Sequence, residues 1–319
     1  MSLRLVLMGT GEFALPVFRT LIEGGEHVVA GVFTQPDRQG RGHHRHVNPV
    51  KQLAEQFHIP VFQPERVNRL DVLNQLRELT ADVFLVAAYG QILKPELLAI
   101  PRLGAFNLHG SLLPRHRGAA PVQYSVWCGD QQTGVTIFQI EPALDSGPII
   151  GRVTTDISPE DTSATLMLRL AELSIPLTLE SLSRLESGTA EHIVQDASRV
   201  TLSPKLTRDD GIVNWNSPAS AVDCQVRAMQ PWPKASTWLH APDHPPLRCI
   251  LLKVDPAPEG SPSQSAAAGE VRIVGRRLFV QTSDRWLEIL SIQPEGKRPM
   301  DAAGFLNGHT VPVGSRFSR

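Results

Sequence analysis

Residues 3–15 of the chain read LRLVLMGTGEFAL. An apolar run ends in a Gly-Thr-Gly turn at 9–11, and the apolar residues that follow, among them Phe13, Phe18 and Leu21, recur at helical spacing. The pattern predicts a strand, a tight turn and a helix. It recurs downstream, with strands expected over 28–33, 61–62, 83–88 and 135–140 and helices over 50–57, 70–79, 122–128 and 164–185. This alternation is typical of an α/β fold: a Rossmann-like, doubly wound and mostly parallel sheet covered by helices.

From about residue 205 the pattern changes. Helical periodicity is confined to 219–227, and the other apolar segments are short and β-type, at 235–239, 249–254, 269–274, 277–281 and 286–292. Such spacing favours a small C-terminal β-barrel of the OB-like kind that binds oligonucleotides. We therefore expect two domains, over 1–204 and 205–319, with 256–268 as an exposed loop.

Composition is that of an ordinary globular protein of 319 residues, 41% hydrophobic and 20% charged. It contains no apolar run of the roughly 20 residues that a membrane span needs. The first residues lead into a strand and not into a signal peptide, so we expect a cytoplasmic protein. The three cysteines, Cys128, Cys224 and Cys249, are widely separated, which favours neither a disulfide framework nor a zinc site.

The net charge of -1 hides an uneven distribution. Residues 1–204 carry 17 Lys and Arg against 21 Asp and Glu, whereas residues 205–319 carry 14 against 11. A phosphate-rich partner would therefore prefer the second half.

Residues 9–14 match G-x-G-x-x-A, the dinucleotide-binding signature. A nicotinamide cofactor would also need an acidic residue at the end of the second strand, where the chain has Thr34-Gln35. Asp37 lies beyond, behind a proline in a basic loop. We therefore interpret the small residues as allowing a tight strand-to-helix turn.

Residues 107–121 read NLHGSLLPRHRGAAP and carry the strongest chemical signal. Asn107 and His109 stand two apart at the end of an expected strand, so their side chains share one face. An imidazole titrates near physiological pH and can exchange a proton, while an amide can donate a hydrogen bond to a developing oxyanion. Asp145 follows the expected strand at 135–140, and neighbouring strand ends gather at one edge of such a sheet. An acid beside His109 would fix its tautomer and stabilise its protonated form.

The stretch 107–121, followed by LDSG at 144–147, closely resembles the signature of the formyltransferases that use 10-formyltetrahydrofolate. The resemblance implies that Asn107, His109 and Asp145 are the catalytic trio. In the mechanism that we expect, Asp145 holds the imidazole and organises a water as relay. It implies that Ser111, Leu112, Leu113 and Pro114 contact the folate, which we expect to lie between them and 85–91, beside Tyr89 and Gly90. The folate is then a cosubstrate, and neither a tightly bound cofactor nor a metal is expected.

The loop that reads QPDRQGRG at 35–42 resembles the basic loop of methionyl-tRNA formyltransferases, which holds the acceptor end of the tRNA. Arg38, Arg41 and Arg45 can reach phosphates and stack on unpaired bases. Here the loop is one residue shorter than the usual pattern, and histidines at 43, 44 and 46 stand where lysines are common. A metal site is the other interpretation of these histidines, although no carboxylate or Cys accompanies them convincingly.

The resemblance continues through LSPKL at 202–206, where the matching lysine, Lys205, faces the tRNA and Ser203 replaces the commoner alanine. It also covers 226–233 and 304–308. It implies transfer of a formyl group to the α-amino group of methionine on initiator tRNA, by a protein that we expect to be a monomer. Two alternatives stay open: a related formyltransferase or formyl-folate hydrolase, and an RNA-binding protein without enzymatic activity, which would leave the trio unexplained.

Overall fold

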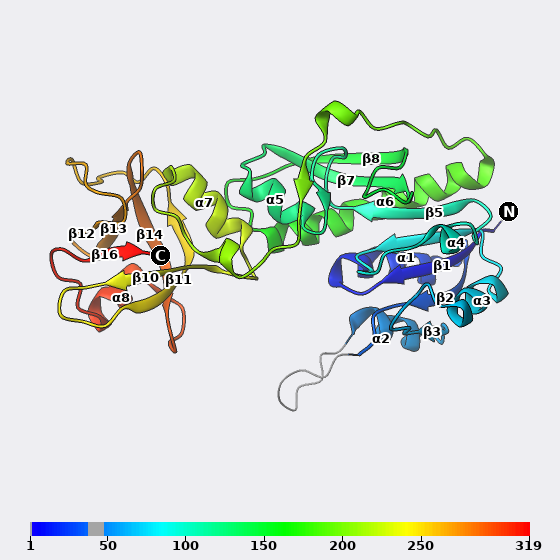
Figure 1. Ribbon diagram of the computed structural model, residues 1–319, viewed down its shortest axis with the longest axis horizontal. Helices are drawn as coiled ribbons and strands as arrows, with labels where there is room; N and C mark the ends of the chain where they lie inside the picture. Colours follow the sequence, from blue (N-terminus) through cyan, green and yellow to red (C-terminus); the bar gives the residue numbers. More distant parts are fainter. Residues whose placement is uncertain (1, 38–47) are drawn as a thin grey trace. The chain divides into compact units, whose positions relative to one another are not determined.

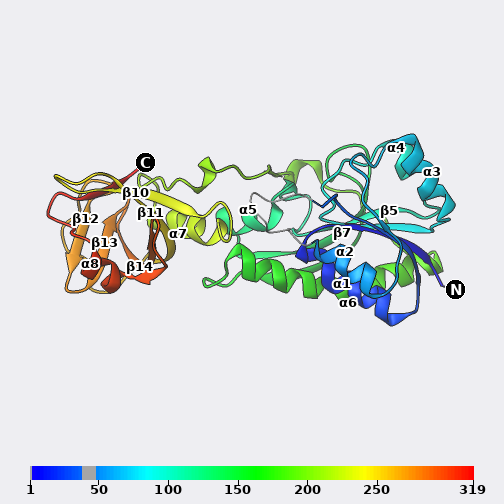
Figure 2. The ribbon, with the colours of Figure 1, turned by 90° about the horizontal axis from the view of Figure 1, so that it is seen from below.

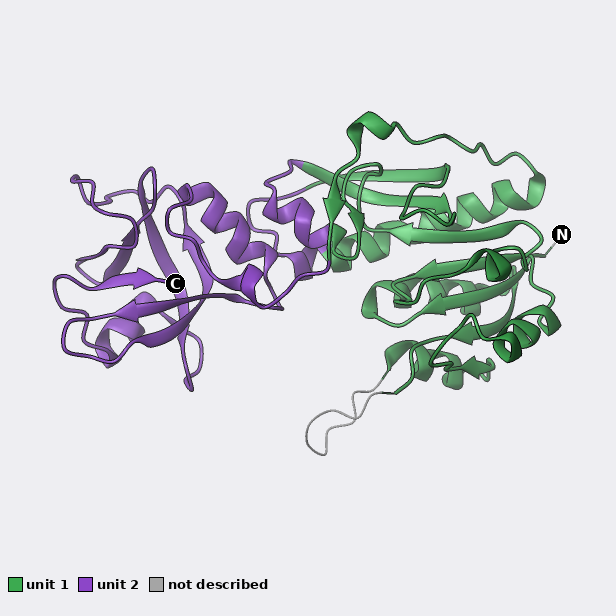
Figure 3. Ribbon diagram, in the orientation of Figure 1, with its two compact units in different colours: residues 1–121, 132–156, 167–204 green, residues 122–131, 157–166, 205–319 purple. Residues whose placement is uncertain are grey.

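The computed structural model describes residues 2–37 and 48–319, which form two compact units (Figure 3). Unit 1 comprises 1–121, 132–156 and 167–204; unit 2 comprises 122–131, 157–166 and 205–319. The units thus differ from a simple division at residue 204, because two short segments cluster with the C-terminal part. One of them is tied there by Ser163, whose Oγ donates to the carbonyl oxygen of Ala228 at 2.6 Å.

Unit 1 is built on a seven-stranded sheet with the order β3-β2-β1-β4-β5-β7-β8 (Figure 1). Its strands are β1 (Arg4–Gly9), β2 (Val28–Phe33), β3 (Val61–Phe62), β4 (Val83–Ala87), β5 (Gly104–His109), β7 (Gln132–Gln139) and β8 (Ile149–Asp156). The first five run parallel, whereas β7 is antiparallel to β5 and β8 is antiparallel to β7. The expected mostly parallel α/β sheet is therefore confirmed, and β8 is a strand that the sequence analysis did not predict.

Helices cover both faces of this sheet (Figure 2). They are α1 (Leu15–Gly24), α2 (Pro49–Gln56), α3 (Leu70–Glu78), α4 (Pro95–Leu98) and α6 (Ser163–Ser187). Helix α5 (Pro121–Trp127) belongs mainly to unit 2. Side chains alternate along each strand. Phe84 therefore packs in the core with Leu76 of α3, while Leu85 lies beside Leu182 of α6.

The turn after β1 shows why small residues stand there. A Cβ added at Gly9 would lie 2.7 Å from both the carbonyl oxygen of Ala87 and the ring of Phe18. A residue larger than glycine would push β1 away from β4 and from α1. Packing alone therefore accounts for the first glycine of the G-x-G-x-x-A match.

Unit 2 contains an antiparallel sheet with the order β12-β13-β14-β11-β10-β16. Its elements are α7 (Ala219–Ala228), β10 (Ala235–His240), β11 (Leu247–Asp255), β12 (Val271–Val274), β13 (Arg277–Gln281), β14 (Trp286–Pro294), β15 (Met300–Asp301), α8 (Ala302–Gly308) and β16 (Arg316–Ser318). A bridge between Glu270 and Arg316 joins the two ends of the sheet into a nearly closed barrel. Residues 256–268 contain neither helix nor strand.

Buried apolar side chains fill this barrel, among them Leu251, Leu278, Ile289 and Phe317. Across the described part of the chain, no helix is both long and apolar enough to cross a membrane.

Candidate active site

His109 is the last residue of β5 and is only 4% exposed. Its Nε2 atom lies 2.8 Å from the carbonyl oxygen of His116. Because a carbonyl oxygen can only accept, Nε2 carries the hydrogen and Nδ1 of the neutral ring keeps its lone pair. The ring meets Phe138 edge-on, with centroids 6.2 Å apart. The imidazole is therefore held in one orientation with Nδ1 as its basic nitrogen.

Asp145 lies between β7 and β8, with its Oδ2 atom 3.7 Å from Nδ1 of His109. This separation is longer than a hydrogen bond, so the carboxylate acts on the ring through its charge. The same oxygen accepts a hydrogen bond from the backbone N–H of Gly118 at 2.7 Å. The tautomer of His109 is therefore fixed by the carbonyl of His116 and not, as the sequence predicts, by the acid.

Burial determines the protonation state of His109. It lowers the pKa of the imidazole below its usual value, and the negative charge of Asp145 offsets part of that effect. The ring is therefore neutral at physiological pH. A neutral ring with Nδ1 unprotonated is the form that can accept a proton.

Asn107 precedes His109 by two residues in β5, so the two side chains point to the same face of the sheet. Asn107 is partly exposed, and its amide makes no hydrogen bond to another described residue. The amide can therefore donate to a bound molecule without breaking a contact within the described chain.

The segment Ser111–Pro114 is held tightly against β7 and β8. Thr136 of β7 donates to the carbonyl oxygen of Ser111 at 2.7 Å and accepts from the backbone N–H of Leu113 at 3.1 Å. Arg152 of β8 donates to the carbonyl oxygen of Leu113 at 2.8 Å. Ser111, Leu113 and Pro114 are buried, whereas Leu112 is partly exposed. A ligand beside this segment would therefore meet mainly Leu112.

Tyr89 and Gly90 follow β4 at the same edge of the sheet. The ring of Tyr89 is 2% exposed and lies in the core under α3, where its hydroxyl has no hydrogen-bond partner among the described residues. Burial raises the pKa of this hydroxyl. Gly90 is exposed, with φ +80°. Tyr89 is therefore inaccessible to a ligand, whereas Gly90 is accessible.

Two comparisons with known proteins bear on these residues. Residues 3–181 match the family model described as formyl transferase, and residues 205–310 match its C-terminal domain. The chain is 41% identical, over 97% of its length and 98% of the relative, to a methionyl-tRNA formyltransferase of Methylococcus capsulatus. The chain belongs to the methionyl-tRNA formyltransferase family.

Solved structures of lower identity share the fold of this methionyl-tRNA formyltransferase family member. An N-formyltransferase of Helicobacter canadensis, solved with folinic acid and dTDP-3-aminofucose, has a TM-score of 0.65 at 16% identity, with 91% of this chain and 99% of that one covered. HypX of Aquifex aeolicus, solved with tetrahydrofolic acid, has a TM-score of 0.62 at 16% identity. That match covers 96% of this chain and 47% of HypX, so the chain spans about half the length of that protein.

Two residues that hold the site together are not among those predicted from the sequence. Gln195 donates to the backbone carbonyl oxygens of Asp145 and Gly147, at 2.9 and 2.8 Å. Ser203 donates to the carbonyl oxygen of His116 at 2.9 Å, the same oxygen that accepts from His109. Ser203 is the position at which the chain departs from the alanine common among methionyl-tRNA formyltransferases. The unusual serine is therefore the sequence signal that could have identified position 203, whereas nothing in the sequence singles out Gln195.

The arginines predicted to contact tRNA, Arg38, Arg41 and Arg45, lie outside the described residues, as do the histidines at 43, 44 and 46. The residues at both ends of their loop are described. Asn48, the N-cap of α2, donates through Nδ2 to Thr34 Oγ1 at 2.8 Å and to the carbonyl oxygen of Gln35 at 3.1 Å. Gln35 in turn donates to the carbonyl oxygen of Tyr89 at 2.9 Å. The residues that flank the loop are thereby bonded to one another, and Gln35 links them to Tyr89.

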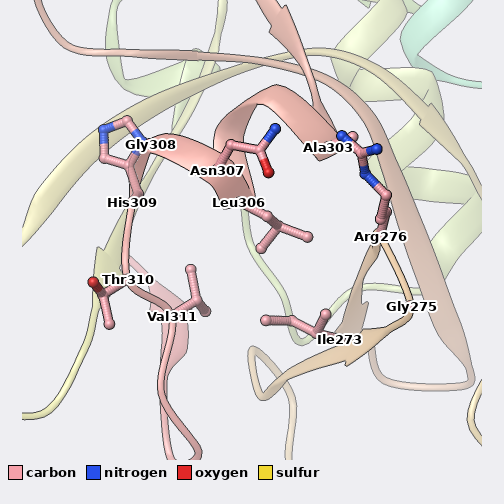
Figure 4. A pocket seen from close by; sticks show the side chains of 10 residues that line it. All are labelled: Ile273, Gly275, Arg276, Ala303, Leu306, Asn307, Gly308, His309, Thr310 and Val311. Carbon is pink, nitrogen blue, oxygen red and sulfur yellow. The ribbon is translucent and has the colours of Figure 1, made fainter.

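Two further features belong to unit 2. Lys205 is exposed and forms no ion pair with a described residue. A pocket of about 540 Å³ in unit 2 lies between the turn at Gly275-Arg276 and the end of α8, where Asn307 and His309 line it (Figure 4). Within the described ranges no group of three or more His, Cys, Asp or Glu could hold a metal ion.

Proposed function

We propose that Asn107, His109 and Asp145 carry out the reaction of this formyltransferase. The enzyme transfers a formyl group to methionine on initiator tRNA, the reaction of the family to which it belongs. One observation carries the assignment of residues: Nδ1 of a buried, neutral imidazole lies 3.7 Å from a carboxylate, and an unengaged amide stands two residues away on the same face of β5. This arrangement suits proton acceptance next to a developing oxyanion.

The formyl donor of the family is a formyl-tetrahydrofolate. We assign 10-formyltetrahydrofolate to the carboxyl edge of β4 and β5, against the main chain of 89–90 and 111–114. Gly90 and Leu112 are the accessible residues of these segments, and ligands of doubly wound sheets bind at that edge. The folate acts as a cosubstrate, so the proposal includes no tightly bound cofactor and no metal.

The acceptor is the α-amino group of the esterified methionine. An unperturbed α-amino group has a pKa of about 7.7 to 8.0, and the electron-withdrawing ester lowers it further, so much of the group is neutral. As its nitrogen bonds to the formyl carbon, Asn107 donates a hydrogen bond to the formyl oxygen, where negative charge develops. Nδ1 of His109 accepts the proton that this nitrogen loses and gives it to N10 of the folate as the bond between N10 and the formyl carbon breaks. Asp145 stabilises the imidazolium between these two transfers.

A transfer assay tests the proposal directly. The protein should formylate charged initiator tRNA in the presence of the folate and leave free small amines largely unreacted. Formylation of small amines at a comparable rate would point to another acceptor. Binding of tRNA without turnover would favour an RNA-binding protein. Because the substrate is an initiator tRNA, we place the reaction in the cytoplasm. We also expect the protein to be a monomer.

Asp145→Asn keeps the size of the side chain and removes its charge. We expect kcat to fall by more than about tenfold, because the imidazolium loses its counter-charge. The same charge holds the pKa of His109 up. Its removal lowers that pKa, so the acid limb of the kcat–pH profile should move to lower pH. An acid limb at the wild-type pH would remove Asp145 from the proposal.

We propose that Arg38, Arg41, Arg45 and Lys205 contact the tRNA. Neutralising one phosphate contact weakens binding and reduces the salt dependence of affinity by about one counter-ion. Arg41→Ala should therefore raise the KM for charged tRNA several-fold, with a shallower salt dependence and kcat nearly unchanged. Arg19→Ala is the matched control, because Arg19 is an exposed arginine on α1 that pairs with Glu23. Equal KM values for the two variants would exclude Arg41 from recognition.

A further inference from the structure

We propose that Gln195 is a positioning residue for the reaction: it holds the Asp145 turn so that the carboxylate stays beside Nδ1 of His109. The proposal rests on the function assigned above. Gln195 lies 50 residues beyond Asp145, just before the short 3-10 helix Ala197–Arg199. It is the buried residue of an otherwise exposed stretch at 191–199.

Both ends of the Gln195 amide are fully engaged. Its Nε2 atom donates to the carbonyl oxygens of Asp145 and Gly147, at 2.9 and 2.8 Å. Its Oε1 atom accepts from Nη2 and Nε of Arg117, at 2.7 and 3.2 Å. The side chain is 8% exposed, so water replaces few of these contacts if they are lost. An amide is the group that combines two donors and an acceptor in this geometry.

The turn that Gln195 holds has an unfavourable backbone. Asp145 adopts φ +44°, a left-handed conformation that costs free energy for any residue other than glycine. At Gly147, an added Cβ would lie 1.8 Å from the carbonyl oxygen of Gln139. Residues 141–144 on the other side of Asp145 are exposed. The hydrogen bonds from Gln195 therefore hold the turn at 145–147 in a conformation that the chain would otherwise leave for a less strained one.

The contacts form a closed ring around the acid. Arg117 and Gly118 form β6 (Arg117–Gly118). Gly118 donates to the carboxylate of Asp145 through its backbone N–H, while Arg117 binds Gln195, which binds the backbone of Asp145. β6 also pairs with β9 (Leu202–Ser203), and Ser203 donates to the carbonyl of His116 that orients His109. A shift of Gln195 would therefore change the separation of the acid from the imidazole.

A purely structural role predicts a different result from a positioning role. If Gln195 only stabilised the fold, its loss would reduce the amount or the melting temperature of active enzyme without altering the titration of His109. If it positions Asp145, its loss takes negative charge away from His109. The pKa of the imidazole then falls, and the acid limb of the kcat–pH profile moves to lower pH.

The test compares Gln195→Leu with Gln225→Leu. Gln225 is a matched control, since it is also 8% exposed and also donates through Nε2 to two carbonyl oxygens, those of Asp210 and Ile212 in unit 2. We expect Gln195→Leu to lower kcat by up to about 100-fold, as a displaced catalytic group can do. The KM for each substrate should stay within about twofold of wild type, and the acid limb should move to lower pH. Gln225→Leu should lower the melting temperature by about as much as Gln195→Leu does, and it should leave the acid limb at the wild-type pH.

Three outcomes are informative. A wild-type acid limb in Gln195→Leu, with the limb shifted in Asp145→Asn, would overturn the positioning role alone. A wild-type acid limb in both variants would overturn the proposed function of Asp145 itself. If Gln195→Leu does not fold, Arg117→Met removes the donors to Oε1 and leaves the two bonds to the turn. It should shift the limb in the same direction by a smaller amount, and an unchanged limb there would count against the proposal.

Discussion

Replacing His109 with alanine is expected to lower kcat by about 100- to 10,000-fold, the usual contribution of a general acid–base group. The reason is specific to this site: Nδ1 is the imidazole nitrogen left unprotonated by the bond from Nε2 to His116, and it faces the acid. The affinity for charged tRNA should stay near that of wild type, because the ring is buried and is not among the residues proposed to contact the tRNA. Single-turnover formylation, with tRNA binding measured separately, checks both parts.

A histidine elsewhere in unit 1 provides the control for His109→Ala. His27 precedes β2 at the amino end of the strands, where its Nδ1 accepts from the backbone N–H of Leu3 at 3.3 Å. His27→Ala should therefore turn over at a rate close to wild type. Normal turnover in a well-folded His109→Ala protein would refute the role given to the imidazole.

Replacing Asn107 with alanine should lower kcat by about 100- to 1,000-fold, the cost of removing one oxyanion donor, equivalent to about 2.7 to 4 kcal/mol. The amide has no other partner among the described residues, so its loss leaves no internal contact broken. KM should change little, because the oxygen carries its full charge only in the transition state. Asn107→Asp should be at least as slow, since it keeps the shape and places negative charge beside the oxyanion.

The pH dependence of kcat distinguishes the role of Asn107 from that of His109. Asn107 does not titrate, so the acid limb of Asn107→Ala should coincide with that of wild type although kcat is much lower. Asn74→Ala, which removes an exposed amide from α3, serves as the control and should leave kcat unchanged. A rise in KM that accounts for the whole loss in Asn107→Ala would assign this residue to substrate binding and not to the transition state.

Local periodicity predicted much of the fold. The strands at 28–33 and 61–62 and the helix at 219–227 agree with β2, β3 and α7 to within one residue. Periodicity could not predict that β7 runs antiparallel to β5, because a strand of given composition can pair in either direction. The path of the connecting segment decides which direction it takes. β8 was missed although Ile149–Asp156 contains β-branched residues in a partly alternating burial pattern.

The sequence by itself determined the alternation of strands and helices, the shared face of Asn107 and His109, and the family. These follow from side-chain period and from the identities of residues close together in the chain. Only the tertiary structure decided which acceptor orients His109, how far Asp145 stands from it and that Gln195 supports the turn. The physical reason is that a backbone carbonyl has no side-chain signature and that partners 50 residues apart meet only when the chain path brings them together.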